Sequence, residues 1–190
     1  SIVLSGDGAA VDVVVGRLES RGVKTTALKV SHAFHSRMMD PILEEFRAVA
    51  ESLDFKPPKK TLISNITGKP WDDAQLSADY WVDHLRGTVR FADGISYAQS
   101  KKFQTFVEIG PKPTLLGLGR ASVPPEFGAW LSSFRPDSEW STLLSCVGQL
   151  YVRGFDINWQ GFYAQSKSQR MQLPNYSWRY QRCWTDVVST

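Results

Sequence analysis

The chain has 190 residues, of which 42% are hydrophobic and 22% charged, and its formal net charge is +3. This composition is typical of one soluble domain, or of one domain with an appendage, and the basic residues form no concentrated stripe of the kind that nucleic-acid binding requires. No apolar run approaches the ~20 residues that a membrane span needs. Cys146 and Cys183 stand in no CxxC or Cys/His spacing, so we expect no metal site, no disulfide framework and a cytoplasmic location.

The first third of the chain predicts alternating strands and helices. Asp7 is a plausible N-cap for the first helix, whose apolar residues recur at spacings of three and four. A lone strand–helix–strand cannot bury both faces of a sheet, so we expect it to pair with strands outside this chain. In chain order, we predict a strand at 2–4, a helix at 9–20, a strand at 23–30, a helix at 38–53 with Ile42, Leu43, Phe46, Val49 and Leu53 on one apolar stripe, and a strand at 61–66.

The remainder predicts two helices, a buried strand and an aromatic tail. The run at 103–109 is almost continuously apolar, which is typical of a central strand. The chain changes character after Pro124 and Pro125, and five of its seven tryptophans lie from Trp130 onward. We predict helices at 80–85 and 91–100, the strand at 103–109, a short helix from 115, a strand at 130–134 and a helix at 143–152.

Two of the three histidines lie in one loop between a predicted strand and a predicted helix, in the segment Ser31-His32-Ala33-Phe34-His35-Ser36. Histidine is suited to general base work because its unperturbed pKa lies near neutrality. A neighbouring serine could serve as nucleophile, but the Gly-x-Ser-x-Gly elbow occurs nowhere in the sequence. A packed loop or a helix cap remains the alternative, and for His84 a structural role is the favoured interpretation.

Five segments of the chain, the loop segment at 30–41 and those at 62–68, 80–94, 106–113 and 173–184, carry a further signal. In this order they resemble the acyltransferase domain of modular type I polyketide synthases. The fold that this implies is α/β: the C-terminal part of a hydrolase-like domain, with half of its ferredoxin-like small subdomain, followed by an aromatic-rich linker. The resemblance divides the chain into 1–68, 69–123 and the linker 124–190.

The resemblance implies transfer of a malonyl unit from coenzyme A, through a serine ester, to the phosphopantetheine thiol of an acyl carrier protein. His35 matches the family's catalytic histidine, the base and then the acid of this chemistry. The family holds that imidazole with a backbone carbonyl, which falls here near Gly87. The family's nucleophilic serine lies upstream of the matched residues, so we expect this chain alone to be inactive.

The residues His32-Ala33-Phe34-His35 resemble the malonyl-selective form of the family's tetrad, which implies substrate contacts for His32 and Phe34. Phe34 is bulky enough to crowd an α-methyl branch, and a role as a core anchor is the alternative. The implied partners are the acyl carrier protein, the rest of the acyltransferase, and the ketosynthase with its linker domain, on which the aromatic tail would dock. No bound cofactor, nucleic acid or membrane is expected.

Two other functions stay open at this point. The chain could be part of a freestanding malonyl transferase of fatty-acid synthesis, although the linker-like segment at 173–184 argues against this. It could also be a non-catalytic interaction fragment, for which the aromatic tail is the main attraction.

Overall fold

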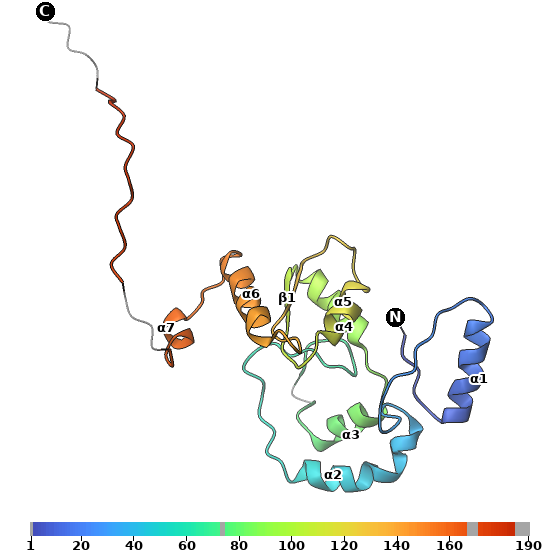
Figure 1. The fold of residues 1–190 in the computed structure, drawn as a ribbon. Coiled ribbons are helices and arrows are strands. Elements are labelled where there is room, and N and C mark those ends of the chain that lie inside the picture. Colours follow the sequence, from blue (N-terminus) through green and yellow to red (C-terminus); the bar gives the residue numbers. More distant parts are fainter. Residues whose placement is uncertain (1, 73–74, 167–170, 185–190) are drawn as a thin grey trace, which may run out of the picture.

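The computed structural model describes residues 2–72, 75–166 and 171–184. Most of the helices gather into two groups, and residues 171–184 run away from both as an extended tail (Figure 1). Among the described residues, no helix is long and apolar enough to cross a bilayer. The elements are α1 (Gly8–Glu19), the 3-10 helix η1 (Arg37–Ile42), α2 (Leu43–Glu51), α3 (Ala78–Arg86), α4 (Phe91–Ser100), β1 (Thr105–Glu108), α5 (Thr114–Arg120), β2 (Ala129–Ser132), α6 (Glu139–Tyr151) and α7 (Trp159–Phe162).

One group is built on a two-stranded parallel sheet. β1 pairs with β2 in a register that places Thr105 opposite Ala129 and Glu108 opposite Ser132. Helix α5 packs on both strands and α6 packs on β2. The domain boundary that we expect at residue 123 falls between β1 and β2 in the chain, and these two strands pair along their whole length.

Two contacts explain how α5 is held against this sheet. The ring of Trp130 on β2 stacks on Phe106 of β1 with centroids 4.2 Å apart, and Gly119 lies so close to the Trp130 ring that a Cβ there would be 2.4 Å from it. At the end of β1, the carboxylate of Glu108 accepts hydrogen bonds from the backbone N–H groups that open α5, which would otherwise lack partners. These donors are Thr114 and Leu115, each at 3.0 Å, and Leu116 at 2.9 Å.

The other group joins η1 and α2 to α3, which Figure 1 shows side by side. Ion pairs join Arg47 to Asp79 and Arg86 to Asp40 across this contact. The N-terminus of α3 is capped by Ser77, whose hydroxyl accepts from the N–H of Tyr80. The buried apolar side chains of this group are Met39, Ala50, Tyr80 and Val82.

The predicted helix at 38–53 is divided into η1 and α2. Pro41 lies inside η1 and supplies no backbone N–H, which favours the tighter 3-10 geometry at the start of the segment. The predicted apolar stripe is wrong as a buried face, because Ile42, Phe46, Val49 and Leu53 are exposed while Ala50 is buried. Helix α2 therefore packs on α3 through the face that also carries Arg47.

The predicted strands at 2–4, 23–30 and 61–66 are absent as strands from the described residues, although Ile63 forms an isolated antiparallel bridge with Pro70. A strand requires a neighbouring backbone to complete its hydrogen bonds. In the described part of the chain the runs at 2–4 and 23–30 pair with no strand, and the run at 61–66 has only a short backbone partner at 69–71. The prediction for α4 is confirmed with its bounds, and those for α1, α3, β1, α5, β2 and α6 are confirmed with shifted ends.

Candidate active site

The loop before η1 is fixed by hydrogen bonds within itself and to α3. Ser36 is 6% exposed, and its hydroxyl donates to the carbonyl of Ala33 at 2.6 Å and accepts from the N–H of Met38 at 3.2 Å. The N–H of His35 donates to the carbonyl of Leu85 at 3.1 Å. His35 itself has a φ of 62°, a left-handed conformation that is uncommon for non-glycine residues and that Lys102 and Asp137 also adopt in this chain.

This backbone conformation brings the His35 imidazole against the C-terminal end of α3. Its Nδ1 lies 3.0 Å from the carbonyl oxygen of His84 and 3.0 Å from that of Gly87. Carbonyl oxygens only accept hydrogen bonds, so Nδ1 carries the proton and Nε2 of the neutral ring is the basic nitrogen. The carbonyls at a helix C-terminus carry partial negative charge, which favours a cation formed beside them.

Gly87 carries one of these two carbonyls, and its backbone lies very close to that of Asp83. As the C-cap of α3, it donates its N–H to Asp83 at 2.6 Å. A Cβ at this position would lie 2.7 Å from the carbonyl oxygen of Asp83, which is closer than real contacts allow. Any larger residue would therefore shift the backbone that presents the carbonyl to His35.

His32 and Phe34 lie on the surface of the same loop. Their rings meet edge to face with centroids 6.0 Å apart, and Nδ1 of His32 lies 3.0 Å from the hydroxyl of Ser31. The Phe34 side chain is 43% exposed, so it does not anchor the loop in a core. The hydroxyl of Ser5, which precedes α1, donates to the carbonyl of Phe34 at 2.5 Å.

His84, for which the sequence favours a structural role, lies in direct contact with His35. The two imidazole rings meet edge to face, with centroids 5.7 Å apart. The amide nitrogen of Asn65 lies 3.4 Å from Nε2 of His84. Burial, and secondarily the charge of His35, lower the pKa of His84 from its ordinary value. No pattern in the sequence pointed directly to Asn65, although this residue lies in one of the five resembling segments.

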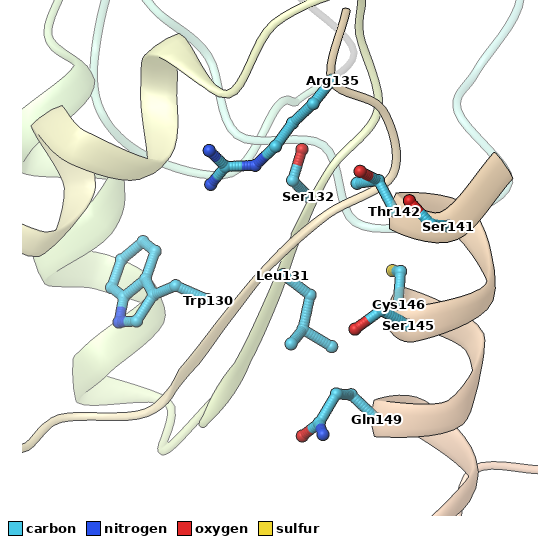
Figure 2. Close-up of a pocket in the computed structure, with 9 residues that line it drawn as sticks. All are labelled: Trp130, Leu131, Ser132, Arg135, Ser141, Thr142, Ser145, Cys146 and Gln149. Carbon is cyan, nitrogen blue, oxygen red and sulfur yellow. The ribbon is translucent and has the colours of Figure 1, made fainter. Parts of the chain in front are cut away.

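A separate groove lies between β2 and α6, with a volume of about 360 Å³. Figure 2 shows Arg135 above Ser132, and the hydroxyls of Ser141, Thr142 and Ser145 along α6. Two of these hydroxyls are already bonded to nearby backbone: Ser132 donates to Phe134 and Ser141 to Ser138. None of the four residues expected at the active site lines this groove. The described residues also contain no cluster of three metal-ligating side chains.

Residues 1–126 match the family model of the acyl transferase domain. The chain is 41% identical over 189 residues to the polyketide synthase GfsB of Streptomyces halstedii, a match that covers 98% of this chain and 3% of the synthase. Among solved structures, the acyltransferase domain from the second module of the salinomycin polyketide synthase matches with a TM-score of 0.80 and 39% identity, over 89% of this chain and 40% of that one.

The acyltransferase domain of SpnD, solved in complex with 2-(pent-4-yn-1-yl)malonyl, matches with a TM-score of 0.74 and 36% identity, over 78% of this chain and 38% of that one. The chain thus spans less than half of either solved chain. The family model, the sequence relatives and the folds agree: the chain belongs to the acyltransferase domain family, and it is homologous to the acyltransferase domains of type I polyketide synthases.

Proposed function

We propose that this chain supplies the catalytic histidine of a malonyl transferase within a polyketide synthase. His35 is the general base and acid, and the observation that supports this role is the pair of carbonyl contacts at Nδ1. Those contacts leave Nε2 free to accept a proton. The carbonyls of His84 and Gly87 take the place that a carboxylate occupies in a serine hydrolase triad, where the third group orients the histidine.

The proposed reaction has two half-steps that balance in protons. In the first, Nε2 of His35 takes the hydroxyl proton of a serine as the serine oxygen attacks the thioester carbonyl of malonyl-CoA. The C–S bond breaks, and the imidazolium returns the proton to the departing CoA thiolate, leaving a malonyl ester. In the second, Nε2 takes the proton of the phosphopantetheine thiol, the thiolate attacks the ester, and the proton returns to the serine oxygen.

The nucleophilic serine of this reaction belongs to a segment outside the 190 residues, because the sequence contains no Gly-x-Ser-x-Gly elbow. The isolated chain should therefore show no transfer. The polypeptide to be tested is therefore a longer synthase that contains these residues. Its activity would depend on the serine hydroxyl of the other segment reaching Nε2 of His35.

His32 and Phe34 are the proposed substrate contacts. Both lie beside His35 on an exposed loop, where a bound thioester could reach them. The relative SpnD was solved with a malonyl derivative, which supports a malonyl-type substrate here. The Phe34 ring would crowd an α-branch, and one methyl group in a pocket is worth about 1–3 kcal/mol, so we propose a strong but incomplete preference for malonyl over methylmalonyl units.

The extended tail is the proposed docking segment for the ketosynthase and its linker domain. Its side chains project from an isolated stretch of chain: Trp178 is 70% exposed and Tyr180 is 94% exposed. Aromatic side chains are enriched at the centres of protein interfaces, where their burial contributes most to binding. The same exposure favours a second candidate function, in which the chain is only an interaction fragment. In that case the tail docks on its partner, and substitution of His35 has no effect on acyl transfer.

Loading of the full synthase polypeptide with labelled malonyl-CoA distinguishes these functions. The polypeptide should form a malonyl ester and pass it to a phosphopantetheinylated carrier protein, and His35→Ala should remove both signals. Glu45→Gln, a change at an exposed residue of α2, is the control and should load normally. Normal loading by His35→Ala would leave only the interaction function.

A further inference from the structure

His84 contacts the candidate base in two separate ways. Its carbonyl oxygen accepts the Nδ1 hydrogen bond of His35, and any residue at position 84 could provide this. Its side-chain ring also meets the His35 ring edge to face, at a centroid distance of 5.7 Å and an interplanar angle of 77°. Only a planar side chain can make this second contact.

The His84 ring is itself held from two directions. On one side the Tyr80 ring lies nearly parallel to it, at a centroid distance of 6.1 Å and an angle of 11°. Tyr80 is buried, and its hydroxyl is hydrogen-bonded at 3.1 Å to that of Ser64, which is 1% exposed. On the other side the Asn65 amide lies 3.4 Å from Nε2. The orientation of the His84 ring is therefore set by packed, hydrogen-bonded neighbours.

The surroundings of His84 also favour its neutral form. The neighbouring side chains on α3 are the phenol of Tyr80 and the indole of Trp81, and the segment after residue 63 contributes the uncharged amide of Asn65. The one titratable group that faces it from the loop before η1 is His35, and in the described residues no carboxylate is hydrogen-bonded or ion-paired with the His84 ring. A second cation beside His35 would oppose the imidazolium that forms during proton transfer, and a neutral ring avoids this repulsion.

We propose that His84 is a positioning residue, whose ring is oriented by Asn65 and Tyr80 and fixes the plane of the His35 imidazole so that Nε2 is aimed at the reacting proton. This inference rests on the proposed function of His35. The carbonyl contacts alone leave the ring free to tilt about the Nδ1 hydrogen bonds, and the edge-to-face contact of the His84 ring limits that tilt.

Substitutions at position 84 distinguish the effect of the ring from that of the backbone carbonyl, because every variant keeps the carbonyl. In the full synthase polypeptide, we expect His84→Ala to lower kcat for self-acylation by malonyl-CoA about tenfold with KM unchanged, since loss of alignment slows the reaction without weakening substrate binding. His84→Phe restores a planar ring and should recover most of that loss. Asn65→Ala should give an intermediate loss, and Glu45→Gln should change neither constant.

The His35→Ala background supplies the test of coupling. If the His84 ring acts through His35, His84→Ala should cause no further loss of rate in the His35→Ala background. If the two side chains act independently, the fold-losses of the two substitutions should multiply. Equal kcat for wild type and His84→Ala, or failure of His84→Phe to recover more activity than His84→Ala, would overturn the inference. Normal acylation by His35→Ala alone would instead overturn the proposed function. Site-specific carbethoxylation of His35 by diethyl pyrocarbonate, followed by mass spectrometry, reports the ring environment without requiring activity, and His84→Ala should change its rate.

Discussion

Nδ1 of His35 lies 3.0 Å from the carbonyl oxygen of Gly87, although 52 residues separate the two in the chain. The contact exists because α3 ends at Gly87, where a helix leaves carbonyl groups without partners within the helix. A side-chain carboxylate in this place could change its protonation state, whereas a backbone carbonyl cannot. The chain thus orients its imidazole with a group whose charge does not depend on pH.

Gly87→Ala tests how far the carbonyl position matters. The added Cβ would meet the Asp83 carbonyl at 2.7 Å, so the backbone must shift and carry the Gly87 oxygen away from His35. We expect kcat for acylation to fall roughly tenfold to a hundredfold while KM is preserved. Gly16→Ala, in open space on α1, is the matched control, and an equal effect of both changes would contradict the account.

Phe34→Ser should widen the range of accepted thioesters. Removing the half-exposed ring beside His35 leaves room for an α-branch, so the preference for malonyl-CoA over methylmalonyl-CoA should fall by about 10- to 200-fold, the value of one methyl group in a pocket. Competition between the two thioesters in a single loading reaction measures this ratio directly. Phe103→Ser alters another exposed phenylalanine and should leave the ratio unchanged. An unchanged ratio for Phe34→Ser would remove Phe34 from the substrate contacts.

The free energy of unfolding should fall as the pH drops through about 6.5, and His84 should contribute to this fall. The pKa of His84 is lowered in the folded chain by burial and by the charge of His35. Between the lowered pKa and the ordinary value near 6.5, the unfolded chain binds more protons than the folded one, so acidification favours unfolding. Denaturant titrations across this range should show a weaker pH dependence for His84→Gln than for wild type. An identical dependence would show that His84 titrates normally.

Glu108→Gln should loosen the start of α5 without affecting the candidate site. The carboxylate accepts three backbone hydrogen bonds there, and a charged acceptor is stronger than an amide. We expect a loss of about 1–2 kcal/mol in local opening free energy, which corresponds to roughly 5- to 30-fold faster hydrogen exchange at the first amides of α5. Glu126→Gln is the control, because Glu126 is exposed and none of the residues that the structure describes donates a hydrogen bond to its carboxylate.

The sequence was informative where a local pattern was enough. Spacing identified most helices, and a five-segment resemblance indicated His35 and the neighbourhood of Gly87. It was uninformative where the outcome depended on partners: the β-branched run at 23–30 is no strand among the described residues, and α2 buries Ala50 while Phe46 remains exposed. The contact of the His84 ring with His35 joins positions 49 residues apart, and only the packing of α3 against the loop before η1 reveals it.

The most direct test of the central claim is the single-turnover rate at which the full synthase polypeptide forms its malonyl ester, measured by rapid quench for wild type, His35→Ala and Glu45→Gln. General base catalysis contributes about 10²- to 10⁴-fold, so we expect His35→Ala to slow ester formation by that factor while Glu45→Gln matches wild type. Ester formation by His35→Ala at the wild-type rate would show that the imidazole held by His84 and Gly87 is not the base.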